Sequence, residues 1–207
     1  MSNYFFSIGR KEEIKKLHDI FTTPISNSES TITLNSISKQ YSILIIEKRR
    51  PHINSSISEN CDPFTGVFFK GWCEDHENSS IILGKRGIEK YFSSIDIDSS
   101  FSEPFDKEGT FVLATWDEKV ATIQNDLYSL FPIIYCHTKS IFMASDSLLL
   151  ISHCRKALSI PCKLNEKVAL GKAWRTHGIA STPLCNETII EGVKSISPGK
   201  HIRLEMG

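Results

Sequence analysis

The residues of this chain that could do chemistry are scattered and do not form a known catalytic motif. Its six cysteines include no Cys-x-x-Cys pair and no nearby histidine pair, which disfavours a zinc site and indicates reduced, structural thiols. No Gly-x-Ser-x-Gly elbow, His-Glu-x-x-His helix or phosphate-binding glycine loop occurs. Ser145-Asp146 is better suited to cap a helix than to form part of a triad, and His177 suits a helix end. No activity follows from these residues by themselves.

The elements that must position any site are clearest between Gly109 and Ser147. Two apolar runs, Phe111–Trp116 and Lys119–Gln124, predict one β-hairpin, and Pro132–Cys136 with Ile141–Ala144 predicts a second. The nearly continuous apolar character of these runs predicts a sheet that is covered on both faces. A helix capped by Ser145 or Asp146 is expected to follow, as far as Lys156.

The rest of the chain adds strands at intervals and few helices. We expect strands over Asn3–Ile8, Thr31–Asn35, Tyr41–Glu47, Gly66–Trp72, Ile81–Leu83, Ile189–Val193 and His201–Glu205, and helices over Lys11–Phe21, Gly87–Ser93 and Glu166–His177. The polar stretch Arg49–Pro63 is expected to be a loop within one domain of residues 1–207. Because no alternating βαβ order is visible, these elements predict an α+β fold.

The charge balance excludes several partners. Lys plus Arg and Asp plus Glu number 24 each, so the basic excess of a nucleic-acid-binding surface is missing. No apolar run reaches the roughly 18 residues that a membrane helix needs, and the N-terminus does not resemble a signal peptide. We therefore expect a cytoplasmic protein that binds neither nucleic acid nor membrane. The tryptophans Trp72, Trp116 and Trp174 stand on apolar elements and are expected to lie in the core.

Several segments in the second half of the chain resemble a known family in sequence and order. Gly109–Asp117 resembles "G-x-F-A-x-x-x-x-D", Asn125-Asp126 with Pro132–Tyr135 resembles "R-D … G-x-x-P-L-Y-Y", Phe142–Asp146 resembles "F-A-S-E", and Thr188–Lys194 with Ser197–His201 resembles "T-x-F-x-G-I-x-x-L-P-P-G-H". These are motifs of the N-terminal, glutamine-amidotransferase-like domain of the asparagine synthetase-related family. The resemblance implies a four-layer αββα sandwich of the N-terminal-nucleophile hydrolase type, with two antiparallel sheets between helices.

The resemblance also implies where a site would lie. In the glutaminase form of the family, a cysteine after the initiator methionine attacks glutamine, and its free α-amino group acts as the base. Here that position is Ser2. The family's "N-G-E" segment corresponds to Lys70-Gly71-Trp72, of which only Gly71 matches. The resemblance offers Glu108 for the acidic residue before the "G-x-F" strand and Arg50 for the arginine that clamps the glutamine carboxylate.

These departures predict a degenerate site that lacks glutaminase activity. The sequence resembles the relatives that close β-lactam rings or cyclise lasso peptides, which keep the fold without the cysteine. In that interpretation Phe5, Phe6, Lys70 and Trp72 fill or reshape the old glutamine pocket. Two alternatives stay open: an active glutaminase or amidohydrolase that uses Ser2, and a module that binds a small molecule or peptide in the vacated pocket.

The resemblance further implies a partner. The family's ATP-dependent synthetase domain carries the loop Ser-Gly-Gly-x-Asp-Ser, which is missing from these 207 residues. We therefore expect no cofactor or metal in this chain, and ATP with Mg²⁺ only in a synthetase domain that follows it or is a separate subunit. Some members of the family form homodimers, and the sequence does not decide the oligomeric state. The expected role is structural, within a protein that forms an amide bond at the expense of ATP.

Overall fold

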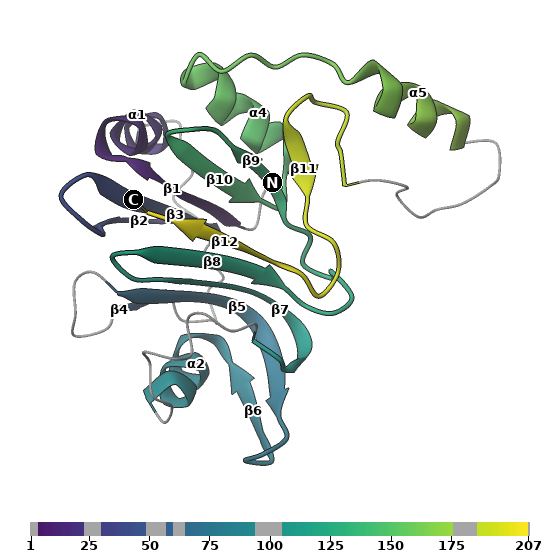
Figure 1. Ribbon diagram of the computed structural model, residues 1–207. Coiled ribbons are helices and arrows are strands. Elements are labelled where there is room, and N and C mark those ends of the chain that lie inside the picture. The colour runs from purple at the N-terminus through teal and green to yellow at the C-terminus, as the bar shows by residue number, and fades with distance from the viewer. Residues whose placement is uncertain are drawn as a thin grey trace.

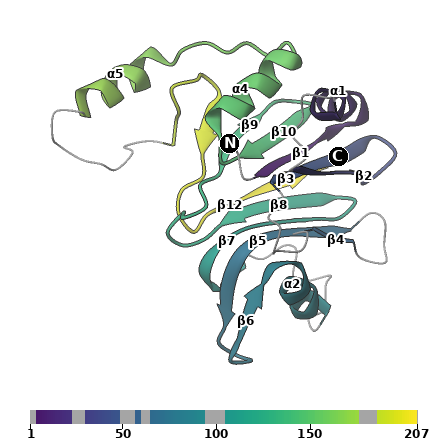
Figure 2. The same cartoon turned by 180° about the vertical axis from the view of Figure 1, so that it is seen from behind.

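A computed structural model of the chain describes residues 4–22, 30–48, 57–59, 65–93, 105–175 and 186–206. Two antiparallel sheets lie face to face, with α1 (Lys11–Thr22) and α4 (Leu148–Ala157) on the outer side of one and α2 (Gly84–Ser93) on the outer side of the other (Figure 1). The view from behind shows the same layers (Figure 2). This order confirms the predicted α+β fold, a four-layer αββα sandwich with two antiparallel sheets between helices.

The first sheet is built around the N-terminal strand. Its six strands run in the order β11 (Val193–Ser195), β9 (Ile134–His137), β10 (Ile141–Ser145), β1 (Tyr4–Arg10), β3 (Tyr41–Lys48) and β2 (Ser30–Ser36). β1 lies at the centre because it pairs with β3 on one side and with the distant β10 on the other. β1 is therefore held between two neighbouring strands.

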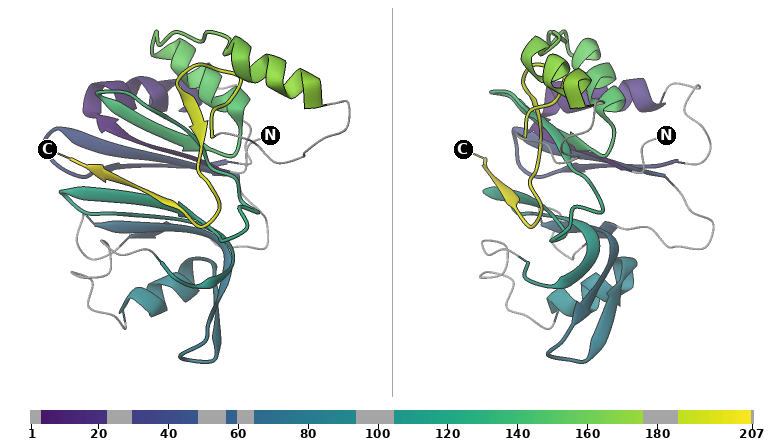
Figure 3. Two further views of the ribbon diagram at one scale, coloured as in Figure 1. Left: turned by 45° about the vertical axis from the view of Figure 1, so that its right-hand side comes forward. Right: turned by 90° about the vertical axis from the view of Figure 1, so that its right-hand side faces the viewer.

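The second sheet contains the hairpin that the sequence predicted after Gly109. Its main path runs β12 (His201–Glu205), β8 (Val120–Asn125), β7 (Glu108–Trp116), β5 (Gly66–Asp75) and β4 (Ile57–Glu59), and β6 (Ser80–Leu83) pairs with the far end of β5. The β5–β6 hairpin extends beyond the end of the sandwich, away from the first sheet (Figure 3). A separate helix, α5 (Glu166–Arg175), follows α4.

Alternation along the strands creates three apolar layers. In β1, Phe6 and Ile8 face the second sheet, whereas Phe5 faces α1 and α4. The layer between the sheets also contains Phe68 of β5 and Trp116 of β7, both buried. A third layer lies between the second sheet and α2. Both faces of the central strands are thus buried, as the near-continuous apolar runs predicted.

Three sequence expectations need correction. Ser147, not Ser145 or Asp146, caps α4, because its side chain accepts a hydrogen bond from the backbone N–H of Leu150. The strand expected over Ile189–Val193 begins only at Val193, because the preceding residues form a turn. Part of the expected loop Arg49–Pro63 forms β4, which pairs with β5.

Other expectations are met or lie outside the described residues. Asn165 accepts a hydrogen bond from the backbone N–H of Val168 and begins α5 as predicted. His177 is outside the described residues, as is the side chain of Trp174. Within the described parts of the chain, no helix combines the length and apolar character required to cross a membrane.

Candidate functional site

The candidate site lies at the end of the sandwich where β1 begins. Tyr4 stands opposite Glu47 of β3, and its ring lies 6.0 Å from that of Phe68 in the other sheet. The Tyr4 hydroxyl donates a hydrogen bond of 2.8 Å to the carbonyl oxygen of Pro132. Burial, with the nearby carboxylate of Asp146, raises the pKa of Tyr4 well above its ordinary value. Tyr4 therefore stays neutral and closes this end of the core.

A buried ion pair joins the two sheets beside Tyr4. The Nζ of Lys70 lies 3.3 Å from Oε1 of Glu47, and both side chains are only 9% exposed. Lys70 comes from β5 and Glu47 from β3, so this pair connects strands that belong to different sheets. Removing both groups from water is costly unless they neutralise each other. The Lys70 ammonium that could stabilise an oxyanion therefore already has a carboxylate partner.

Ser145 and Asp146 lie at the same end, on the other side of β1. Ser145 is opposite Phe5, and its hydroxyl donates to the backbone carbonyl of Tyr4 at 2.8 Å. The same hydroxyl oxygen accepts a hydrogen bond from the backbone N–H of Ser147. These bonds connect the start of β1 to the start of α4, which agrees with a structural role for Ser145 and not with half of a triad.

Gly71 marks the position where β5 leaves the sandwich. Its φ of +118° is unfavourable for residues with a side chain, and a Cβ there would lie 2.0 Å from the carbonyl oxygen of Thr110 on β7. Before it, Lys70 is covered by the first sheet; after it, Trp72 is 42% exposed. The only matched residue of the "N-G-E" segment is therefore required by the backbone, at the point where β5 leaves the sandwich.

The side chains of Trp72 and Glu108 are exposed and do not line the space between the two sheets. The expectation that Trp72 lies in the core is wrong, because β5 has by then passed beyond the first sheet. The Glu108 side chain is 78% exposed, and its Oε2 lies 3.8 Å from Nε2 of His76 near the hairpin tip. Ser2 and Arg50 are outside the described residues. Of the six predicted site residues, the structure thus brings Lys70, Gly71 and Trp72 together and leaves Glu108 at the solvent.

The two phenylalanines expected to fill the pocket lie elsewhere. Phe5 faces the helices, with its ring 5.5 Å from that of Phe21, because adjacent strand residues point to opposite faces. Phe6 does face the other sheet, but it packs deeper in the core against Trp116 and Phe142. The space between the sheets beside Gly71 is occupied instead by Tyr4 and by the ion pair of Lys70 with Glu47.

The Asn125-Asp126 pair, which replaces the family's "R-D", organises loops. The Asp126 carboxylate accepts hydrogen bonds from the backbone N–H groups of Tyr128, Leu130 and Phe131. Its backbone carbonyl also accepts from the N–H of Gly199, in the turn before β12. Two segments that resemble family motifs thus contact each other, and both shape the same end of the sandwich.

Three of the described cysteines are buried and poorly suited to act as nucleophiles. Burial raises the pKa of Cys73 and of Cys154 to about 12, so both remain thiols at neutral pH. Burial also raises the pKa of Cys136. All of them are free cysteines, as is Cys162, which agrees with the predicted structural role. Among the described residues, no cluster of His, Cys, Asp or Glu could hold a metal ion.

Glu47 and Tyr4 are the site residues that sequence reasoning missed. Glu47 is the penultimate residue of the apolar strand YSILIIEK, and a buried carboxylate in such a run is unusual unless it has a partner. That pattern signals a buried pair, but only the packing of the two sheets identifies Lys70 as the partner.

Comparisons with known proteins add little to this geometry. No family model matches the chain, and no curated protein does. Among solved structures, 23 chains match. One is described as the structure of the allosteric regulatory enzyme of purine biosynthesis, with a TM-score of 0.48 and 8% identity over 75% of this chain. The match spans 43% of the length of that protein.

Proposed function

We propose that this chain is a glutamine-amidotransferase-like domain without glutaminase activity. The observation that carries the proposal is the buried pair between Lys70 and Glu47. Lys70 takes the place of the asparagine in the "N-G-E" segment that the resemblance assigns to oxyanion stabilisation. Because its ammonium is neutralised by a residue of the facing sheet, it offers little stabilisation to a developing negative charge.

The role that fits these features is structural, within an asparagine synthetase-related protein that forms an amide bond at the expense of ATP. The partner would be a synthetase domain, attached or separate, and ATP and Mg²⁺ would bind there. The free thiols are in keeping with a reducing, cytoplasmic setting. A relative of this kind that uses an amine within its substrate needs no ammonia, and therefore no active glutaminase.

The test is ammonia release from glutamine by the purified chain, with Ser2→Ala as the control. We expect no release above the background of the variant. Release that disappears in Ser2→Ala would show an active N-terminal nucleophile and would refute the proposal. Intact-mass measurement of the same sample identifies whether Met1 has been removed, so a negative result with Met1 still present is repeated after aminopeptidase treatment.

A further inference from the structure

An open groove lies at the end of the sandwich opposite Tyr4, between turns that belong to the two different sheets. Lys39 lines it from the β2–β3 turn, Lys119 from the β7–β8 turn and Lys11 from the first position of α1, and Met206 lines it just after β12. These segments lie together at the end of the sandwich that carries the C label (Figure 3, left). The volume of the groove is about 600 Å³, and small-molecule sites commonly have about 300–1,000 Å³. We call it the lysine groove, after Lys11, Lys39 and Lys119.

The lysines of the groove have no partner of opposite charge. Within the described ranges of the chain, none of the three has a carboxylate oxygen within 4.0 Å of its Nζ. Glu118 is the one acidic residue among those that line the groove, and it is also without an ion pair there. Three ammonium groups and one carboxylate give the lining a net charge of +2. The groove is therefore suited to an anion.

Backbone hydrogen bonds fix the segments that carry these lysines. The N–H of Lys11 donates to the carbonyl oxygen of Gln40 at 3.0 Å, which ties the start of α1 to the β2–β3 turn. In the β7–β8 turn, the Asp117 carboxylate accepts a hydrogen bond of 2.6 Å from the N–H of Lys119. The carbonyl oxygen of Lys119 accepts from the N–H of Met206 at 2.7 Å. Because the turns are held in this way, all three ammonium groups border one space, and an anion placed there is attracted by each of them.

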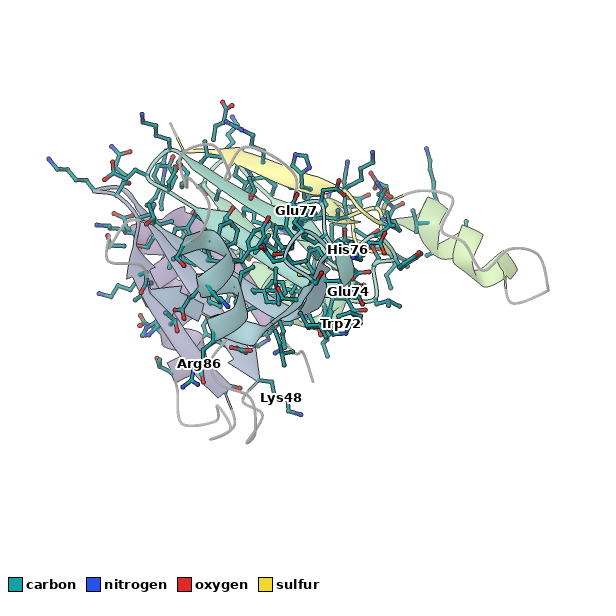
Figure 4. The ribbon with its side chains drawn as sticks, turned by 90° about the horizontal axis from the view of Figure 1, so that it is seen from below. Lys48, Trp72, Glu74, His76, Glu77 and Arg86 are labelled. Atoms are coloured by element: carbon teal, nitrogen blue, oxygen red, sulfur yellow. The ribbon has the colours of Figure 1, made fainter. Side chains whose placement is uncertain are left out.

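The opposite end of the second sheet is richer in carboxylates. β7 begins at Glu108, which pairs with Glu74 of the β5–β6 hairpin, and it ends at Trp116, just before the turn that lines the groove. Figure 4 shows Glu74, His76 and Glu77 in succession along that hairpin. The chain as a whole has a formal net charge of zero. Its uneven distribution of charge favours the approach of an anion to the groove and not to the hairpin.

We propose that the lysine groove binds a small molecule that carries two or more phosphate groups. Lysine ammonium groups are compact cations that commonly bind phosphate, and they outnumber the one carboxylate of the lining. The phosphates contact Lys39, Lys119 and Lys11, and the rest of the molecule lies against Tyr41 and Met206, which line the same groove. A net charge of +2 is matched by an anion with at least two negative charges. This inference does not depend on the proposed loss of glutaminase activity, because the two sites lie at opposite ends of β1.

The experiment uses the full 207-residue chain and inorganic phosphate, diphosphate and triphosphate as probes. Isothermal titration calorimetry at constant ionic strength measures the Kd of each. We expect saturable binding that is tightest for triphosphate and weakest for phosphate, and that weakens when the salt concentration is raised. A single-stranded oligonucleotide of about ten nucleotides is titrated in parallel. Tighter binding of the oligonucleotide than of triphosphate would overturn the proposal, because the occupant would then be a nucleic acid.

Two triple variants with the same change of net charge locate the site. The groove variant combines Lys11→Gln, Lys39→Gln and Lys119→Gln, and we expect it to raise the Kd of triphosphate at least about tenfold. The control variant combines Lys16→Gln, Lys90→Gln and Lys156→Gln, which are exposed lysines of α1, α2 and α4 outside the groove. We expect it to change the Kd less than about twofold. Thermal melts show whether each variant folds, and the single groove substitutions are measured as well, so that the test does not depend on the triple variant.

Glu118→Gln supplies a change in the opposite direction. It removes the one carboxylate that lines the groove and is expected to lower the Kd of triphosphate about twofold. Weaker binding by Glu118→Gln would overturn the proposal. So would equal losses in the two triple variants, or the absence of saturable binding of all three inorganic probes.

Discussion

Glu47 and Lys70 stand on different sheets, and their charged groups meet 3.3 Å apart in the layer between them. This pair lies where β1 begins and directly before the bend at Gly71. The pair buries Lys70, the first residue of the predicted Lys70-Gly71-Trp72 site. Its contribution to the free energy of unfolding can be measured.

Removing one member of the pair should destabilise the fold more than removing both. Glu47→Gln leaves the Lys70 ammonium buried beside a neutral group and is expected to lower the free energy of unfolding by about 3 kcal/mol. The double variant Glu47→Leu, Lys70→Met is expected to lie closer to the wild type, because no buried charge remains. Urea unfolding of Glu47→Leu, of Lys70→Met and of the double variant gives the coupling between the two positions. A double variant as unstable as the sum of the singles would contradict this.

Gly71 should not tolerate a side chain. Gly71→Ala is expected to cost at least about 2 kcal/mol, because of its positive φ and because the new Cβ would overlap the Thr110 carbonyl oxygen. Gly171 in α5 is the matched control, since a Cβ there meets nothing within 4 Å. Gly171→Ala is expected to stabilise the chain by about 0.5–1 kcal/mol. Denaturant unfolding compares the two, and equal effects would show that the bend is not strained.

The hairpin should lose stability in acid. Hydrogen bonds from Asn78 and from Lys107 hold the pKa of Asp75 below its ordinary value of 3.8. A carboxylate with a lowered folded-state pKa contributes stability above its unfolded pKa and loses that contribution as pH falls through the folded one. The melting temperature of Asp75→Asn should therefore be lower than that of the wild type at neutral pH. The difference should close below about pH 3.8, and a constant difference at every pH would argue against this role.

Lys107 should make the stability of the chain depend on pH in the alkaline range. Burial by itself lowers the pKa of Lys107, but its hydrogen bond to Asp75 and the nearby negative charges leave the pKa above the ordinary 10.5. A raised folded-state pKa gives stability that is present below the unfolded pKa and lost as pH rises through the folded one. As the pH rises above about 10.5, the wild type should therefore lose stability in thermal melts, and Lys107→Met should lose less over the same pH range.

Among the described cysteines, thiol labelling should separate the buried ones from Cys162, which is partly exposed. Cys73 and Cys154 have pKa values of about 12 and are buried, so an alkylating reagent at pH 8 should modify them only after unfolding. Cys162 is partly exposed and should react in the folded protein. Peptide mapping by mass spectrometry reads each site individually. Modification of Cys154 at the rate of Cys162 would show that the layer beneath α4 opens readily.

Local patterns in the sequence determined the secondary structure and the fold class. The nearly continuous apolar runs between Gly109 and Ser147 predicted a sheet that is covered on both faces, and turn residues near Asp117 and His137 marked the two hairpins. The strand expected over Ile189–Val193 begins only at Val193, because Ile190 packs against the core from a turn and not from a strand. The cap at Ser147 was missed because Ser145, Asp146 and Ser147 are all good caps, and only backbone geometry selects one.

The tertiary structure alone decided which residues meet. Lys70 and Glu47 are both visible in the sequence as charges on apolar strands, but their contact depends on how two sheets stack, which no local pattern encodes. Trp72 reads as a core residue because its strand is apolar, and it is exposed because the facing sheet ends before it. Periodicity determines which face of a strand a residue occupies; whether that face is covered depends on the extent of the neighbouring layer.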